Sequence, residues 1–140
     1  MMDISLNEYR ALARFRHLIR GFLQFSEEAA RTQNLEPQQH QMLLVIRADD
    51  DPAGPTIGAV AEQLFIRHHS AVGLADRLEE HGLIHRVRQE GDRRQVRLQL
   101  TRRGAALLEH LSQSHHAELR KSAPGLVAAL SDLLQGVAAE

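Results

Sequence analysis

Asp92, Arg93 and Arg94 directly follow Glu90-Gly91, a pair whose glycine favours a turn. A guanidinium group at the tip of a turn suits the narrow, negative minor groove of A·T-rich DNA. We therefore expect Arg94 to enter a minor groove, with the Asp92 carboxylate accepting its hydrogen bonds and holding it extended. The alternative is an isolated surface ion pair, which contributes only ~0–1 kcal/mol.

Three more arginines flank this turn, Arg86 and Arg88 before it and Arg97 after it. Together with Arg93 they are either phosphate contacts or solvated charges, and residue type alone does not separate the two. As phosphate contacts they would set the affinity for DNA and its salt dependence rather than the choice of sequence. Residues 67–103 carry nine arginines against five acids, although the net charge of the chain is only -1. A nearly neutral protein can in this way present one basic face.

A second group of hydrogen-bond donors precedes the turn. The residues of this group that are expected to face DNA are Arg67, His68, His69, Ser70, Val72, Gly73 and Arg77. Ser70 is expected to cap a helix or donate to a phosphate, and Arg77 to reach a phosphate or a guanine edge. The two histidines either donate to phosphates and bases or form a polar turn without a partner. Because glycine costs about 1 kcal/mol relative to alanine inside a helix, either DNA approaches the backbone at Gly73 or the position is merely tolerated.

The arginine-rich turn needs two strands to hold it. Residues 83–89 alternate between an odd-numbered side, predicted to be apolar, and an even-numbered side that carries Arg86 and Arg88. Residues 95–100 alternate in the same way and predict the returning strand. Gly82 is expected to end the helix before this hairpin in a left-handed conformation.

Short helices are expected to precede the hairpin. Thr56 is a suitable N-cap for a helix over residues 57–65, and after a break at 66–69 a second helix is expected over 70–81. Two such helices joined by a tight turn form a helix-turn-helix, whose second helix normally lies in the major groove. A further helix should begin at Pro37 and end before the loop 49–55.

Long amphipathic helices are expected towards both ends of the chain. Apolar residues recur at helical spacing from Leu6 to Phe25, a stripe too long for one small domain to cover. A helix after Thr101 is expected to run to about Leu119, and Ala123-Pro124 to start a last one. The residues expected to pack against a second copy of the chain are Leu6, Tyr9, Leu12, Leu126, Leu130, Leu133 and Leu134.

Composition bounds the remaining classes of function. A chain of 140 residues with 43% hydrophobic and 25% charged residues is long enough for one packed domain. It contains no cysteine, no glycine-rich phosphate loop after a strand and no nucleophile in an activating context, so we expect neither an enzyme nor a cofactor. Without an apolar stretch of about 20 residues or an export signal, the chain is expected in the cytoplasm and not in a membrane.

Nine histidines raise the question of a metal site. His110, His115 and His116 share one expected helix, and His17 and His40 stand on two others. His110 and His115 are five residues apart, whereas two ligands on one helical face need a spacing of about three or four. We expect no metal site, and a zinc-responsive regulator is the alternative.

Several motifs, in this order, resemble those of the MarR family of bacterial transcriptional regulators. The most specific is Asp92-Arg93-Arg94 followed by residues 100–104, LTRRG, which is similar to the family's wing and its exit into the fifth helix. Residues 78–86, LEEHGLIHR, resemble the end of the family's recognition helix, and residues 35–39, LEPQQ, the start of its second helix. The resemblance covers nearly the whole chain.

This resemblance implies a homodimer with intertwined terminal helices that binds a pseudo-palindromic operator in double-stranded DNA. It also implies that DNA affinity falls when a small anionic or phenolic effector enters a crevice, whose residues the sequence does not assign. We therefore predict a mainly α chain with a small β-hairpin wing, organised as one MarR-type domain over residues 1–140. The winged helix-turn-helix is expected over about 36–101, and the dimerisation helices over about 4–34 and 102–138.

The predicted function is sequence-specific regulation of transcription, as a repressor. A winged helix that binds another protein instead of DNA is the alternative from a different class. Such a module has little need of an arginine-rich wing.

Overall fold

The computed structural model describes residues 3–88 and 95–138. Contacts divide the chain into two compact units, residues 1–29 with 113–140 and residues 30–112, here called the helical unit and the winged unit. Helices α1 (Leu6–Thr32) and α5 (Arg102–Ala138) each contribute to both units. The remaining elements belong to the winged unit: α2 (Pro37–Ala48), α3 (Ile57–Leu64), α4 (His68–Glu80), β1 (Ile84–Arg88) and β2 (Val96–Leu100).

The starts of α2 and α3 follow from their capping residues. The Glu36 backbone N–H donates to Gln39 Oε1 at 2.8 Å, and Pro37 occupies the first turn of α2, where its missing N–H costs nothing. At α3, Thr56 Oγ1 accepts the Ala59 N–H at 3.1 Å. Both predicted helix starts are confirmed.

Helix α4 begins two residues before the predicted Ser70. Phe65 adopts a left-handed conformation with φ 55°, and the Ile66 N–H closes the end of α3 on the Ala61 carbonyl at 3.0 Å. This turn is so short that Arg67 already stands at the N-cap of α4, without a side-chain cap hydrogen bond. Ser70 therefore lies inside the first turn, and the prediction that it caps the helix is wrong. At the other end, Gly82 has φ 74° and ends the helix as predicted.

The hairpin is antiparallel, with a register that runs from Ile84↔Leu100 to Arg88↔Val96. Ile84 and Leu98 are almost completely buried, so the even-numbered side of β1 faces the core. The prediction that the odd-numbered side of β1 is the apolar one is wrong, because Arg86 spans the edge of the core and ends on acids of α4. The sequence pattern did not predict that the segment before α3 also pairs with β2, where the Leu98 N–H donates to the Pro55 carbonyl at 2.9 Å.

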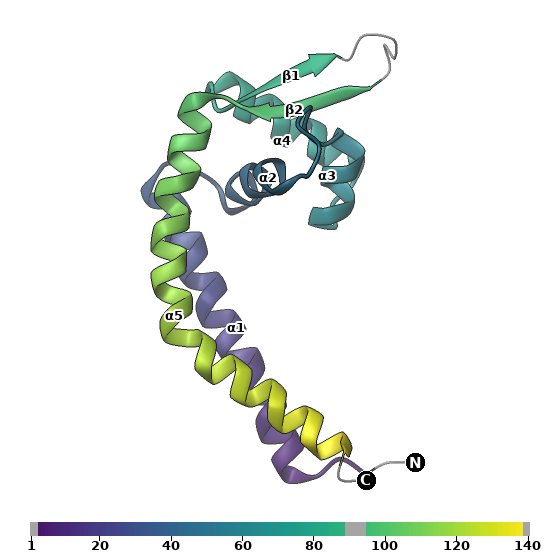
Figure 1. Cartoon of the computed structure of the whole chain (residues 1–140), viewed down its shortest axis with the longest axis vertical. Helices are drawn as coiled ribbons and strands as arrows, with labels where there is room; N and C mark the ends of the chain where they lie inside the picture. Colours follow the sequence, from purple (N-terminus) through teal and green to yellow (C-terminus); the bar gives the residue numbers. More distant parts are fainter. Residues whose placement is uncertain (1–2, 89–94, 139–140) are drawn as a thin grey trace. The chain divides into compact units, whose positions relative to one another are not determined.

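The core of the winged unit lies where α2, α3 and α4 pack on one side of the hairpin (Figure 1). Its largest fully buried side chains are Met42, Leu43, Val60, Leu78, Ile84, Leu98 and Leu111. Three short helices followed by this hairpin make a mainly helical winged helix-turn-helix, as predicted.

In the helical unit, α1 and α5 lie side by side and antiparallel (Figure 1). Ser26 meets His115, with 2.8 Å between Oγ and Nε2, and Leu18 meets Gly125, where an added Cβ would come within 3.2 Å of Leu18 Cδ1. These contacts lie on both sides of Pro124, and they hold α5 helical although proline cannot donate the usual backbone hydrogen bond. The prediction of two separate helices around Ala123-Pro124 is therefore wrong.

Two helices cover little apolar surface by themselves. Among the described residues of the helical unit, only Ala11, His115 and Ala129 are buried. Large apolar side chains remain exposed on both helices: Leu6, Tyr9, Leu12, Leu23, Leu119, Val127, Leu130 and Leu134. In the part of the chain that the structure describes, no helix is long and apolar enough to span a membrane.

Candidate nucleic-acid interface

Helix α4 has one buried and one outward side. Ala71, Leu74, Ala75 and Leu78 fill the buried side. Of the residues predicted to face DNA, Arg67, His68, His69, Ser70 and Arg77 are exposed, whereas Val72 and Gly73 are half-buried. Because the side chain of the N-cap residue Arg67 makes no cap hydrogen bond, an anion such as a phosphate can bind the backbone N–H groups of the first turn.

Arg86 is the most extensively bonded arginine of the described wing. Its Nη2 lies 2.6 Å from Asp76 Oδ1, and its Nη1 lies 2.8 Å from Glu79 Oε1. Nη2 also donates to the Val72 carbonyl at 3.4 Å, and the Arg86 backbone N–H donates to Glu79 Oε2 at 3.1 Å. Burial acts to lower the pKa of Arg86, but the hydrogen bonds that Arg86 donates to Asp76 and Glu79, together with the attraction of their charges, outweigh it and raise that pKa above its ordinary value. The guanidinium is therefore committed to α4.

Arg97 is committed to the loop before α3. Its Nη1 donates to the Gly54 carbonyl at 3.1 Å and lies 3.6 Å from Asp51 Oδ2, while Nη2 donates to Gln95 Oε1 at 3.2 Å. The side chain is only 19% exposed. A phosphate contact by Arg97 would require part of this arrangement to open.

Arg88 differs from both. It ends β1, is exposed, and makes no ion pair with another residue that the structure describes. It is thus the described wing arginine best placed for a phosphate. Asp92, Arg93 and Arg94 lie outside the described residues, so the predicted minor-groove contact stays a prediction.

Sequence reasoning missed the residues that fasten the hairpin to its neighbours. Thr101 Oγ1 donates to the Gly82 carbonyl at 2.7 Å and accepts the Gly104 N–H at 3.0 Å, and Arg103 Nη1 donates to the His81 carbonyl at 2.9 Å. The N-cap position of Thr101 was readable from its place before α5. The acids that bind Arg86 were also readable, because Asp76 and Glu79 are three residues apart and share a helix face.

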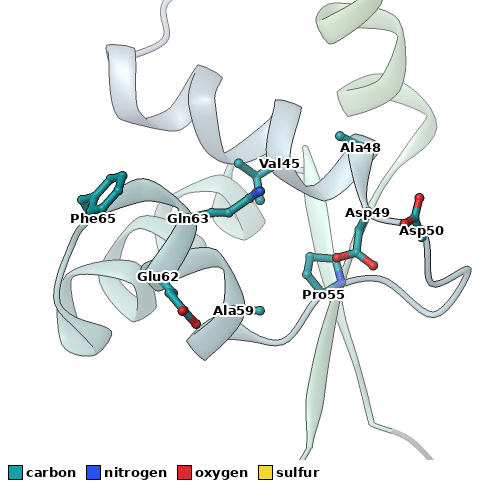
Figure 2. Close-up of a pocket in the computed structure, with 9 residues that line it drawn as sticks. All are labelled: Val45, Ala48, Asp49, Asp50, Pro55, Ala59, Glu62, Gln63 and Phe65. Atoms are coloured by element: carbon teal, nitrogen blue, oxygen red, sulfur yellow. The ribbon is translucent and has the colours of Figure 1, made fainter.

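A surface pocket of about 770 Å³ lies among the end of α2, the loop 49–55 and α3 (Figure 2). Its lining residues are Val45, Ala48, Asp49, Asp50, Pro55, Ala59, Glu62, Gln63 and Phe65. Three of these residues are acidic and none is basic, so the pocket does not suit an anionic effector, which is one of the two classes that the family resemblance implies.

The histidines do not come together. Within residues 3–88 and 95–138, no group of three or more His, Cys, Asp or Glu side chains is arranged to hold a metal ion. His115 is buried, makes edge contacts with the rings of Phe22 and Phe25 at centroid distances of 5.8 and 5.4 Å, and forms a hydrogen bond with Ser26. His17, His110 and His116 are exposed.

Comparison with known proteins bears on the whole arrangement. A sequence model of the MarR family matches residues 33–95. The transcriptional regulator PecS of Dickeya dadantii is 31% identical over 81 residues, which cover 58% of this chain and 49% of PecS. YfiV of Bacillus subtilis, an uncharacterised transcriptional regulator, is 33% identical over 66 residues, which cover 47% of this chain and 41% of YfiV. The matches thus span half or less of these two relatives.

Solved structures match over a greater length. A mutant MarR from E. coli complexed with operator DNA is 27% identical, with a match that covers 96% of this chain and 99% of that MarR chain, and has a TM-score of 0.68. Wild-type E. coli MarR in its apo form is 25% identical, with coverage of 97% and 98% and a TM-score of 0.68. AbsC of Streptomyces coelicolor, at 18% identity, shares the fold with a TM-score of 0.74 and coverage of 99% and 96%.

Proposed function

Because this chain belongs to the MarR family, we propose that it regulates transcription by binding DNA in a sequence-specific manner, as a repressor. The family and the relatives named above are transcriptional regulators, so the chain is not an enzyme. The observation that carries the proposal is the outward side of α4. It presents Arg67, His68 and His69 at the helix N-terminus, where Arg67 makes no side-chain cap hydrogen bond, and Arg77 in the last turn.

The chemistry of this surface suits a duplex. Backbone N–H groups at the start of α4 and the exposed Arg88 can bind phosphates, which fixes the register of the protein on DNA. Arg77 lies farther along the same helix, where a guanidinium can bond a guanine edge in the major groove. Arg94 is proposed for the minor groove. The E. coli MarR in complex with operator DNA matches this chain at 27% identity over nearly its whole length, which supports the same use of the fold.

A homodimer is proposed because the helical unit leaves its apolar side chains uncovered. Leu6, Tyr9 and Leu134 are 63%, 58% and 71% exposed, a combination typical of a surface that packs against another protein. The residues proposed for the dimer contact are Leu6, Tyr9, Leu12, Leu126, Leu130, Leu133 and Leu134. Two copies would present two α4 helices to half-sites about 34–36 Å apart, one turn of the duplex.

Regulation by a small effector is part of the proposal. An effector that binds one spacing of the two α4 helices better than another shifts the dimer away from the spacing that DNA requires. An anionic or phenolic molecule is proposed on the family resemblance, with its binding residues unassigned.

The test is a salt-dependent titration of the purified protein against duplex from its own upstream region, with random duplex as the control. The proposal expects saturable binding at about 10⁻⁸ M or tighter, preference for the upstream fragment, and steep weakening with salt. Equal binding of both duplexes, no tighter than about 10⁻⁶ M, contradicts it for that fragment. Repeating the titration with zinc and with a genomic library then separates a zinc-responsive regulator, a distant operator and a winged helix that binds a protein.

A further inference from the structure

Arg86 lies in the arginine-rich wing, yet its guanidinium contacts other residues of the protein. It is 23% exposed, and its guanidinium lies 2.6 Å from Asp76 and 2.8 Å from Glu79. Arg88 follows two residues later on the same side of β1 and is exposed. Two arginines of one strand therefore have different surroundings, although the sequence pattern treats them alike.

The acids that Arg86 binds lie on the proposed recognition helix. The side chains of Asp76 and Glu79 are 55% and 41% exposed. A carboxylate on a helix that approaches DNA repels phosphates, and two on one face would oppose binding unless a cation compensates them. Arg86 supplies that cation from within the chain.

The same contacts join strand to helix at several points. Val72, Asp76 and Glu79 lie along one face of α4, over about two turns, and each accepts a hydrogen bond from Arg86. Glu79 accepts two, one from the guanidinium and one from the Arg86 backbone N–H. Charge-assisted bonds of this kind to both backbone and side chain restrict how β1 can move relative to α4.

We propose that Arg86 is a positioning residue for DNA recognition, which neutralises Asp76 and Glu79 and holds the wing at a fixed angle to α4, and that it is not a phosphate contact. This inference rests on the proposed function. It replaces, for Arg86 alone, the DNA contact that the sequence predicts.

Salt dependence distinguishes the two roles. Removing a phosphate contact weakens binding to every sequence and reduces the slope of log affinity against log salt by about 0.9. Removing a positioning residue leaves the number of phosphate contacts unchanged but lowers the preference for the operator. The variants are Arg86→Lys, Arg86→Gln and Asp76→Asn, and Arg88→Gln is the matched control on the same strand.

Each variant is titrated with the operator fragment and with random duplex over a salt series. For Arg86→Lys, Arg86→Gln and Asp76→Asn, we expect the ratio of operator affinity to random-duplex affinity to fall on the order of threefold to tenfold. The slope of log affinity against log salt should stay unchanged. Asp76→Asn and Arg86→Gln change the net charge in opposite directions, so a common loss of preference cannot come from charge alone. Arg88→Gln is expected to lower the affinity for both duplexes equally and to reduce the slope of log affinity against log salt.

Two results overturn the inference. One is an Arg86→Gln protein that behaves like Arg88→Gln, and the other is an Arg86→Lys protein with wild-type preference. A wild-type protein that does not prefer any fragment refutes the proposed function instead. In that case, urea unfolding of Arg86→Gln, Asp76→Asn and the double variant still tests the ion pair between Arg86 and Asp76. A double variant hardly less stable than Arg86→Gln supports the contact, whereas additive shifts of the midpoint contradict it.

Discussion

Replacing Gly73 with alanine separates the contribution of this position to protein stability from its contribution to DNA binding. Gly73 lies in the interior of the helix, where alanine is favoured over glycine by about 1 kcal/mol. Apart from its chain neighbours and the backbone of α4, the described residues place only Arg77 Nη1 within 4 Å of an added Cβ, at 3.7 Å, which is an ordinary contact with the end of a flexible side chain. We therefore expect Gly73→Ala to increase the free energy of unfolding by about 1 kcal/mol, because no contact with the described residues offsets the gain in helix propensity.

The assay is urea unfolding at a fixed protein concentration, since the stability of the proposed homodimer would depend on concentration. With a typical slope of about 1–3 kcal/mol per molar urea, the midpoint should rise by roughly 0.3–1 M. Gly58→Ala is the control, because Gly58 is exposed on α3 and, beyond its chain neighbours and the helix backbone, no atom of the residues that the structure describes lies within 4 Å of an added Cβ. An unchanged or lower midpoint for Gly73→Ala, with a gain for Gly58→Ala, refutes the reasoning about space at Gly73.

DNA binding by the same variant addresses why a glycine is there. Ser70, Gly73 and Arg77 lie along one stripe of α4, and the two flanking residues are exposed. If DNA approaches the backbone at Gly73, the added methyl group should reduce operator affinity about tenfold, or ~1.4 kcal/mol, in a protein that is more stable. A stabilised protein with wild-type affinity would show that the position is merely tolerated.

Three further changes test other parts of the structure. Arg94→Ala should weaken the binding free energy for an operator with A·T-rich flanks by ~1–3 kcal/mol and leave the proposed dimer intact by light scattering. Unchanged affinity removes Arg94 from the minor groove. Gly104→Ala should destabilise the protein by ~1–3 kcal/mol in urea, because an added Cβ would overlap the Leu83 carbonyl oxygen. A wild-type midpoint would mean that the start of α5 can shift freely. Leu98→Ala should lower the free energy of unfolding by ~2–5 kcal/mol, since Leu98 is completely buried on β2. A decrease below about 1 kcal/mol would argue against the observed register of the hairpin.

The short elements of the winged unit were predictable because their signals are local. Thr56 caps α3 with its own hydroxyl, Pro37 starts α2, and Gly82 ends α4 with a positive φ. The family motif at residues 100–104 was also visible, and the structure explains it by packing: Thr101 bonds Gly82, and Gly104 leaves space for the Leu83 carbonyl. None of these explanations requires DNA.

The errors arose where tertiary contacts override a local preference. Pro124 normally starts or breaks a helix, but α1 contacts α5 on both sides of it and keeps one continuous helix. Ser70 is a better N-cap by residue type than Arg67, yet the left-handed Phe65 reverses the chain so early that α4 has begun before Ser70. A local pattern cannot report how sharply the preceding turn folds.

The wing arginines show the limit of charge patterning most directly. Alternation along residues 84–88 places Arg86 and Arg88 on the same side of a strand, and a count of charges makes both part of one basic face. Strand β1 runs past α4, however, so that Arg86 comes within reach of Asp76 and Glu79 while Arg88 stays exposed. Arg86 therefore adds less to the basic surface of the wing than a count of arginines suggests. The same pairing neutralises part of the negative charge of α4. If the internal pairing is correct, the salt slope of operator binding will follow Arg88 and the residues of the arginine-rich turn, and the choice of operator will be sensitive to Arg86, which touches no DNA.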